Sequence, residues 1–388
     1  MMKKIGVCAC YNTKNYGSML QSLATCHELE VLGFEYEIIR YSRKKTLNLI
    51  LRSLSRIPGQ VKESLKKRQD SAKVSKYPEV KKGIAERNGC FDKFMNQTFT
   101  KMSPIYDTFG ELNQAAQKYD AVLVGSDQLW RPESYTTGFY TLEFVPDDVK
   151  KIAYATSFGV SQIPSGKIAV AKKFLNRIEH ISVRELRASE MVNELTGRTV
   201  PTVVDPTLLF NAEQWNQLIP VTPVKEAGEH YIFCYLLGSN PEHRKAVEAL
   251  AKKTGCKIVT IPHLDEFVEN DLSFGDKQLY NVGPAEFVNL IRHADYVCTD
   301  SFHGSVFSIL NHKQFVTFSR FAEGSKNSRN SRIDSLLSQT GLTERHCKVY
   351  SNLDEQIKQS IDYVQVETHL TEMRSASVGY LKEALTFI

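Results

Sequence analysis

Residues 3–42 read KKIGVCACYNTKNYGSMLQSLATCHELEVLGFEYEIIRYS, and this stretch decides the predicted fold. Residues 3–11 are a short apolar run typical of a buried strand, and residues 34–42 alternate as a second strand. Residues 20–33, between them, have helical spacing and end at Gly33. Together they form a β-α-β unit, and successive units of this kind build a parallel sheet.

The alternation of strands and helices continues along the rest of the chain. Strand-like runs recur in DAVLVGSDQLW, KKIAYATSFG and HISVRE, and a short one in GRTVPTVVDP ends in a turn at Asp205. A second series follows in HYIFCYLLG, CKIVTIPH, DYVCTD and QFVTFS. A stretch rich in proline and polar residues near 205–228 separates the two series. We therefore expect two α/β domains, residues 1–210 and 211–350, followed by a helical tail at 351–388. Ligands of such a pair bind in the cleft between the carboxyl ends of the strands.

The 388 residues have an ordinary globular composition, with 42% hydrophobic and 24% charged residues. The eight cysteines show no CxxC spacing, which indicates buried free thiols in a reducing compartment rather than disulfides or a zinc site. No run approaches the ~20 apolar residues of a membrane span, and the first apolar run is too short for a signal peptide. We therefore expect a cytoplasmic protein.

The positive net charge of +5 reflects many lysines and arginines between residues 40 and 93. The pattern is mostly helical over residues 46–118, and we expect a basic helical insert at 43–93. Such a segment is typical of a solvated helix face or loop, although it would also suit contact with an anionic membrane surface. It has neither interleaved aromatic residues nor a known binding motif for nucleic acid, so nucleic acid is not an expected partner.

Short polar segments follow several of the predicted strands. Six of them stand out, at residues 12–17, 125–128, 156–159, 182–185, 238–240 and 299–304. Any one of these segments could be a plain turn, because Gly, Ser, Asn and Asp all serve turns well. Since the carboxyl ends of parallel strands lie along one edge of a sheet, six such segments favour a ligand cleft.

The segment TDSFHG at 299–304 is the most informative, because an apolar helical pattern follows it directly. A helix beginning near Ser301 points free backbone N–H groups at the cleft, which suits a phosphate or a carboxylate. Gly304 and Ser305 would let an anion approach the backbone closely. His303 suits proton transfer there, because the pKa of histidine lies near neutrality. The alternatives are that Ser301 is simply an N-cap and that His303 is a hydrogen-bonded structural residue.

Cationic side chains are expected to complete the site. Arg184 closes the strand pattern ISVRE, where a guanidinium can grip a carboxylate or phosphate with two N–H groups. The alternative is that Arg184 forms an ion pair with Glu185 or another acid. Lys326, Arg329 and Arg332 lie in a polar stretch after QFVTFSR, which is either a cationic lid or a solvated loop.

Several motifs of other enzyme classes are missing from the sequence. The chain lacks GxGxxG after the first strand and also lacks GxxxxGK[ST], so dinucleotide and P-loop sites lose their main support. It also lacks GxSxG, which argues against a hydrolase nucleophile elbow. There is no HExxH and no DxD run, and we expect no metal site.

Taken in order, these motifs resemble those of the polysaccharide pyruvyl transferase family. The matching pieces are NYGSMLQSLA, LGFEYEIIRY, DAVLVGSDQLW, IAYATSFG, ISVRE, VVDPTLLF, YVCTDSFHGSVFSILNHKQFVTF and SRIDSLL. They extend from residue 5 to about residue 342, whereas the basic segment and the tail after 350 match nothing distinctive. The resemblance implies a GT-B-like fold of two Rossmann-like domains facing across a cleft. The first domain would hold the acceptor and the second the donor.

The resemblance also implies a reaction. The enolpyruvyl group of phosphoenolpyruvate would move to a sugar of a surface polysaccharide or its lipid-linked precursor, forming a pyruvate ketal and releasing phosphate. No cofactor is implied beyond this donor substrate. A lipid-linked glycan acceptor would fit peripheral contact with the inner face of the membrane. Two other functions stay open: a nucleotide-sugar-dependent GT-B glycosyltransferase, and a non-catalytic glycan-binding protein on the same fold.

Roles for individual residues follow from this reaction. We expect His303 to be the general acid and Asp127 or Asp300 to deprotonate the sugar hydroxyls, although which residue gives and which takes a proton stays open. The candidate substrate-binding residues are Arg184, Ser301, Phe302, Gly304, Ser305, Lys326 and Arg332, together with Asn15, Tyr16, Gly17, Ser126 and Gln128 on the side of the first domain.

Overall fold

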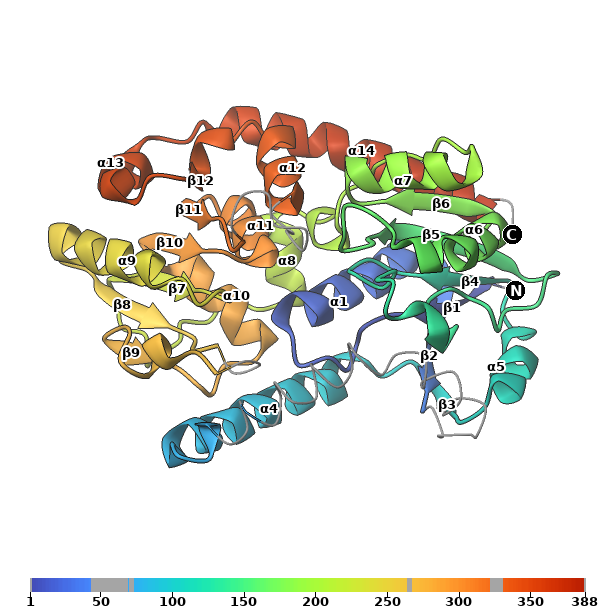
Figure 1. Ribbon diagram of the computed structural model, residues 1–388, viewed down its shortest axis with the longest axis horizontal. Helices are drawn as coiled ribbons and strands as arrows, with labels where there is room; N and C mark the ends of the chain where they lie inside the picture. The colour runs from blue at the N-terminus through green and yellow to red at the C-terminus, as the bar shows by residue number, and fades with distance from the viewer. Residues whose placement is uncertain (1, 43–68, 70–72, 264–266, 322–330, 387–388) are drawn as a thin grey trace.

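The computed structural model describes residues 2–42, 69, 73–263, 267–321 and 331–386. Figure 1 shows two sheets side by side, each covered by helices. The first sheet contains β1 (Lys4–Cys8), β2 (Glu35–Tyr41), β3 (Met102–Tyr106), β4 (Ala121–Val124), β5 (Lys150–Thr156) and β6 (His180–Val183). The second contains β7 (Tyr231–Tyr235), β8 (Lys257–Thr260), β9 (Lys277–Gln278), β10 (Tyr296–Thr299), β11 (Gln314–Phe318) and β12 (His346–Cys347).

Both sheets have the same doubly wound topology. Their strand orders are β3-β2-β1-β4-β5-β6 and β12-β11-β10-β7-β8-β9, and neighbouring strands are parallel throughout. The chain reverses direction across the sheet between β1 and β4 in the first sheet, and between β7 and β10 in the second. Ligands of open α/β sheets bind at this switch point, beyond the carboxyl ends of the strands.

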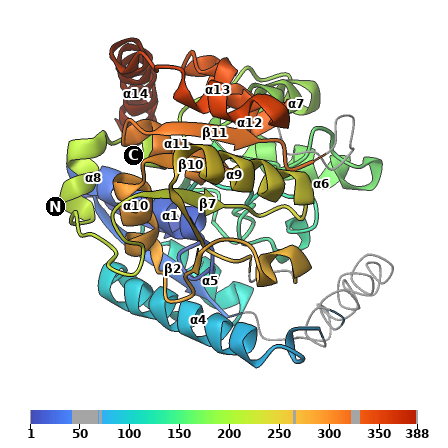
Figure 2. The same cartoon turned by 90° about the vertical axis from the view of Figure 1, so that its left-hand side faces the viewer.

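Helices connect the strands and cover both faces of each sheet (Figures 1 and 2). The α-helices are α1 (Tyr16–Val31), α4 (Pro78–Thr98), α5 (Phe109–Ala116), α6 (Ile168–Arg177), α7 (Leu186–Thr196), α8 (Ala212–Leu218), α9 (Pro241–Thr254), α10 (Pro284–His293), α11 (Phe302–Leu310), α12 (Ser331–Gln339), α13 (Leu353–Lys358) and α14 (Tyr363–Thr386). The 3-10 helices are η1 (Tyr135–Thr137), η2 (Ser165–Lys167), η3 (Pro206–Leu208), η4 (Glu269–Leu272), η5 (Thr343–Arg345) and η6 (Tyr350–Asn352).

Two helices that point into the cleft begin with side-chain caps. Asn15 precedes α1, and its Oδ1 accepts a hydrogen bond from the Ser18 backbone N–H at 3.0 Å. Ser301 precedes α11, and its Oγ accepts from the Gly304 N–H at 3.3 Å. Each cap satisfies one N–H that has no acceptor inside its helix, and so fixes the start of the helix at the strand end.

Two long helices lie on opposite sides of the molecule and contact both halves (Figures 1 and 2). In α14, the Tyr363 hydroxyl donates to Lys313 O near the second sheet, and the Tyr380 hydroxyl donates to Ala153 O of the first. In α4, Gly83 lies against the ring of Tyr280. The chain therefore crosses between the two halves several times. None of the described helices is long and apolar enough to cross a membrane.

The structure differs from the sequence-based expectation in three segments. Residues 102–106, expected within a helical region, form the edge strand β3, where Pro104 is tolerated because an edge strand needs fewer N–H donors. The strand expected in GRTVPTVVDP is reduced to one bridge between Thr202 and Val183. Most of the expected basic insert at 43–93 lies outside the described residues, and its described remainder belongs mainly to α4.

Candidate active site

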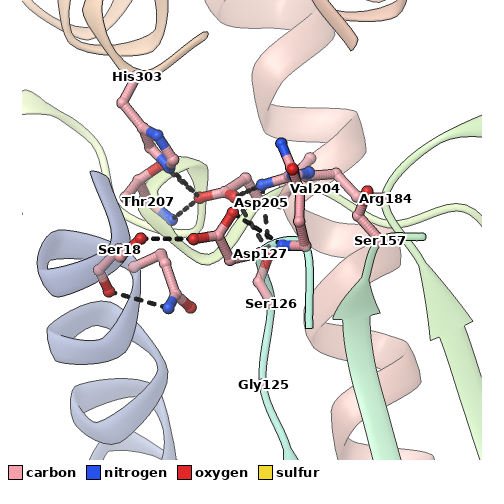
Figure 3. A network of polar contacts seen from close by, with 12 residues as sticks. Ser18, Gly125, Ser126, Asp127, Ser157, Arg184, Val204, Asp205, Thr207 and His303 are labelled. Atoms are coloured by element: carbon pink, nitrogen blue, oxygen red, sulfur yellow. Dashed lines mark hydrogen bonds and ion pairs between the residues drawn. The ribbon is translucent and has the colours of Figure 1, made fainter. Parts of the chain in front are cut away.

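The switch points of the two sheets face each other, and polar side chains from five segments meet between them (Figure 3). From the first half come the start of α1, the residues after β4 and the residues after β6. The turn at Asp205 follows, and the start of α11 comes from the second half. These are the segments that carry the polar motifs of the sequence, with the addition of the turn at Asp205.

Asp205 lies at the centre of the contacts and is buried. Its Oδ1 accepts from the backbone N–H and the hydroxyl of Thr207, at 3.0 and 2.7 Å. Its Oδ2 accepts from the Ser126 hydroxyl at 3.1 Å and from Arg184 Nη1 at 2.5 Å. Burial alone would raise the pKa of Asp205, but His303 and then Arg184 hold that pKa well below its usual range. The carboxylate is therefore ionised and rigidly held.

His303 is the second residue of α11, and its side chain points toward Asp205, as Figure 3 shows. Its Nε2 lies 3.7 Å from Asp205 Oδ1 and makes no hydrogen bond to any described residue. The imidazole lies directly over Gly17, where a Cβ atom would come within 1.9 Å of Nδ1. The α1 helix therefore admits His303 because position 17 has no side chain.

Asp127 follows β4 with a φ of 79°, in the left-handed region that glycine favours. Such a conformation costs a non-glycine residue about 1–3 kcal/mol, and it is often retained at functional sites. The Ser18 hydroxyl donates to Asp127 Oδ2 at 2.5 Å. Burial would raise the pKa of Asp127, but Arg184, His303 and this hydrogen bond together lower it. Asp127 is therefore ionised at neutral pH.

Arg184 is buried between three acids. Its Nη1 contacts Asp205, its Nε donates to Glu185 Oε1 at 3.1 Å, and the charge of Asp127 also acts on it. Burial opposes its charge, but these three carboxylates together raise the pKa of Arg184 above its usual value. Its Nη2 has no hydrogen-bond partner among the described residues. Arg184 thus forms an ion pair, which was one of its two expected roles. Its Nη2 stays available for a further hydrogen bond.

Arg332, at the start of α12, lies near the Phe302 ring, as Arg184 does. The guanidinium carbons of Arg184 and Arg332 lie 4.7 and 5.9 Å from the centre of that ring, a geometry typical of cation–π contacts. With its amide oxygen turned toward Arg332, Gln128 accepts from both terminal nitrogens at 2.8 and 2.9 Å. Burial and then the charge of Arg184 lower the pKa of Arg332. Its Nε has no partner among the described residues.

Asp300 does not fit the expected role of a base. Its two carboxylate oxygens accept the backbone N–H groups of Leu237 and Gly238, both at 2.7 Å. Arg320 adds a 3.6 Å ion pair to the same side chain. Asp300 is fully buried, so it ties the loop after β7 to the end of β10 rather than facing a substrate.

Five further candidates are placed differently from the expectation. Tyr16 is buried, stacks on Phe287 of α10 and donates to Val282 O, so it joins α1 to the second half. Asn15 caps α1, and Ser126 is held by Asp205. The other two belong to α11: the Ser305 hydroxyl bonds to Thr317, and Gly304 leaves room for Thr299, 2.5 Å from where its Cβ would be.

The start of α11 keeps part of its expected anion-binding character. The Gly304 N–H donates to the Ser301 hydroxyl. Among the described residues, the N–H groups of Phe302 and His303 are therefore the ones at this helix start that could bind an anion. Lys326 and Arg329, expected in a cationic lid, lie outside the described residues.

Three residues of the site escaped the sequence analysis. Asp205 was seen only as part of a turn before the linker, Ser18 as part of the loop before the first helix, and Arg320 as the end of a strand. Arg320 donates to Asp300 O at 2.9 Å, and its Nε has no partner among the described residues. The available signal was weak, because each is a single polar residue in a loop, turn or strand-end segment, and many such segments carry polar residues.

Two cavities flank Arg332. One is a small cavity of about 10 Å³ lined by residues that include Arg184, Glu185, Asp205 and Phe302. The other, of about 20 Å³, lies between residues 157–160, the start of α7 and the start of α12. No three His, Cys, Asp or Glu side chains in the described part of the chain are arranged to hold a metal ion.

Two Rossmann-like domains whose switch points face each other define a protein of the GT-B fold, here with buried cations at the cleft. The sequence profile of the polysaccharide pyruvyl transferase family matches residues 15–320, and the chain belongs to that family of transferases. No curated protein sequence matches the chain significantly.

Solved structures support the fold at low sequence identity. A UDP-GlcNAc 2-epimerase from Methanocaldococcus jannaschii is similar, with a TM-score of 0.54, 11% identity and 100% of both chains covered. The Staphylococcus aureus MnaA–UDP co-structure has a TM-score of 0.53 and 12% identity, over 100% of this chain and 98% of that one. A 2-epimerase-like protein from Listeria monocytogenes gives 0.51 and 12%, over 96% and 91%. At such identities the likeness shows the fold alone.

Proposed function

We propose that this enzyme moves the enolpyruvyl group of phosphoenolpyruvate onto two hydroxyls of one sugar, forming a pyruvate ketal and releasing phosphate. The acceptor is a surface polysaccharide or its lipid-linked precursor. The donor is a substrate, and no cofactor takes part in the proposed reaction.

One observation carries this proposal. Two buried nitrogens at the cleft, Arg184 Nη2 and Arg332 Nε, have no hydrogen-bond partner among the described residues. Leaving a buried donor unpaired costs about 1–3 kcal/mol, which a bound anion would recover. Phosphoenolpyruvate places a phosphate and a carboxylate on three carbons, so it needs several donors at close quarters. The grouping of both arginines around the Phe302 ring fits such a small, doubly anionic ligand.

The proposed chemistry begins with proton transfer from His303 to the methylene carbon of the donor, which becomes the methyl group. The positive charge that develops at C2 is attacked by one sugar hydroxyl, which loses its proton. The bond from C2 to the phosphate oxygen then breaks, and the second hydroxyl attacks C2 and also loses its proton. One hydroxyl proton restores His303 and the other leaves with phosphate, so protons balance.

Asp127 is proposed to stabilise the positive charge at C2 and to accept a hydroxyl proton. Its lowered pKa keeps it ionised at neutral pH, which suits electrostatic stabilisation better than strong basicity. Asp127 accepts one backbone N–H, from Gln128, and the Ser18 hydroxyl, whereas each oxygen of Asp300 accepts a backbone N–H group. Asp127 is therefore the less committed of the two carboxylates that the sequence offered for this role. The acceptor is proposed to enter from the first domain, beside the cavity at residues 157–160.

The test is to incubate the protein with phosphoenolpyruvate and a panel of aryl and lipid-linked glycosides. We expect phosphate release that depends on an acceptor and yields a pyruvylated sugar. His303→Ala should lose at least about 100-fold in kcat with little change in donor Kd, as removal of a general acid does. Arg184→Ala should weaken donor binding itself. Phosphate release that survives both substitutions unchanged would exclude this site.

A nucleotide-sugar glycosyltransferase is the second candidate, because the structural neighbours include proteins solved with UDP or UDP-GlcNAc. The same panel separates the two functions when UDP-sugars replace phosphoenolpyruvate. Sugar transfer from a UDP-sugar without any turnover of phosphoenolpyruvate would favour the second candidate.

A further inference from the structure

We propose that Asp205 is the positioning residue of His303: it holds the proton on Nε2 and orients the ring so that Nδ1 delivers the catalytic proton. This inference rests on the proposed function of His303 as general acid. Asp205 itself never takes the proton and does not contact the donor. In the transfer step Nδ1 loses its proton to the methylene carbon, and the neutral ring keeps the proton on Nε2.

Asp205 is suited to this task because the rest of the molecule fixes it. Thr207 binds Oδ1 twice, and Ser126 and Arg184 bind Oδ2. The carboxylate also belongs to the turn that begins η3, where it caps the Thr207 N–H. A carboxylate held in this way cannot follow a moving imidazole, so the imidazole must adopt the direction that the carboxylate sets.

His303 faces this carboxylate with one defined nitrogen. Nε2 is buried, has no hydrogen bond to a described residue, and lies 3.7 Å from Asp205 Oδ1. This separation exceeds a hydrogen bond by less than 1 Å, and catalytic hydrogen bonds are often long before substrate binds. The ring packs closely on Gly17, where a Cβ would lie 1.9 Å from Nδ1, and this contact fixes the ring from the side opposite the Nε2 that faces Asp205.

The charges around His303 come from several elements. Asp205 and Asp127 face it from the first half and favour its protonated form. Arg184 and Arg332, around the neighbouring Phe302 ring, and the positive end of α1 oppose that form. Asp205 is the acid within ion-pair distance of the ring, so its charge is the one whose removal should be felt most.

The experiment compares Asp205→Asn with Asp271→Asn in the full chain. Asp271 is also a buried aspartate paired with an arginine, Arg244, but it makes no contact with His303, so it controls for loss of a buried charge. NMR titration without substrate, assigned with His303→Gln, measures the pKa of His303. We expect Asp205→Asn to lower that pKa by about one unit or more and Asp271→Asn to leave it unchanged.

Steady-state kinetics supply the second readout. In Asp205→Asn, kcat should fall at least about 10-fold, and the basic limb of its pH profile should shift with the His303 pKa. An unchanged His303 pKa with only weaker donor binding would overturn the proposal, because Asp205 would then act through Arg184 alone. If Asp205→Asn fails to fold, Thr207→Val removes one bond to Oδ1 and leaves the charged carboxylate freer to act on His303, so it should raise the His303 pKa; an unchanged pKa in that variant would overturn the proposal.

The experiments distinguish failure of the proposed function from failure of the proposed role of Asp205. If the wild-type protein turns over no phosphoenolpyruvate, the proposed function fails, while the titration still shows whether Asp205 sets the protonation of His303.

Discussion

Gly17, at the start of α1 in the first half, contacts His303 of the second half. Its missing side chain allows the His303 ring to lie against the start of α1. We expect Gly17→Ala to displace His303 and to lower kcat at least about 10-fold, because misplacement of a catalytic group by 1 Å can cost 100-fold.

The control for this substitution is Gly89→Ala. Gly89 lies in α4, and a Cβ there meets nothing within 4 Å, so alanine should leave kcat unchanged and stabilise the helix by up to about 1 kcal/mol. Equal activity of Gly17→Ala and the wild type would show that His303 is not held where the structure places it. Steady-state kinetics and thermal unfolding measure both effects.

Arg332 is the second arginine near the Phe302 ring, and its substitution tests the proposed donor site independently of Arg184. We expect Arg332→Gln to weaken phosphoenolpyruvate binding at least about 10-fold, since truncating a charged hydrogen-bonding partner costs about 1.5–3 kcal/mol. Arg332→Lys should recover only part of this, because an ammonium cannot copy the planar fork of a guanidinium. Calorimetry measures Kd. Arg177→Gln is the control: Arg177 is a partly exposed arginine at the end of α6 that pairs with Asp147, and its substitution should leave the donor Kd unchanged. Unaltered affinity in Arg332→Gln would remove Arg332 from the donor site.

At this scale the sequence predicted some positions and missed others. His303, Arg184 and Asp127 follow strand ends, and the strand-to-helix rule of α/β proteins directs attention to such positions. Asp205 was missed because its position opposite His303 depends on how the chain returns after β6, which no local pattern encodes. Whether a polar side chain faces a ligand or a neighbour, as for Asp300, also depends on packing between the two halves.

Helix α1 carries a buried acid whose protonation should affect stability. Burial raises the pKa of Glu28 to about 7, against a smaller opposite effect of Lys382 on α14. The folded pKa therefore lies above the unfolded value, so this group's contribution is fully present below about pH 4 and is lost as the pH rises through 7.

Glu28→Gln should consequently be more stable than the wild type at pH 8, by up to about 3 kcal/mol at about 1.4 kcal/mol per pH unit, and no more stable near pH 4. Denaturant unfolding at both pH values measures the difference. An advantage that is the same at both pH values would mean that the acid is not buried in its neutral form. Glu194→Gln, on the exposed face of α7, should show no such pH dependence of the gain.

At the element scale, the strands with long apolar runs were predictable and the short edge strands were not. β1, β4, β7 and β10 are buried on both faces, so they read as continuous apolar segments. β9 and β12 have two residues each, and β3 contains Pro104. Their sequences therefore cannot be distinguished from those of loops.

The molecule as a whole is held together by crossings between its halves. Helix α14 bonds to both sheets, and Tyr16 of α1 packs on α10. We therefore expect a single thermal unfolding transition rather than one for each sheet. Phosphoenolpyruvate at 100 times its Kd should stabilise the folded state by about 2.7 kcal/mol and shift that whole transition upward. Differential scanning calorimetry that resolves two transitions, with only one moving, would contradict this.

At this scale the sequence indicated two α/β halves, and the family resemblance indicated the GT-B fold, which the structure and its solved neighbours show. The return of α14 to the first sheet was not predicted, because an amphipathic helix pattern does not say which surface it covers.

The central claim is that the cleft protonates phosphoenolpyruvate and ties it to a sugar as a ketal. The most direct measurement is ¹³C NMR of the product formed from [3-¹³C]phosphoenolpyruvate and an accepted glycoside in D₂O. The proposed chemistry predicts a labelled methyl group that carries one deuterium, on a ketal carbon bound to two sugar oxygens, with one phosphate released per ketal. A label that stays in unreacted donor while a UDP-sugar is consumed would contradict it.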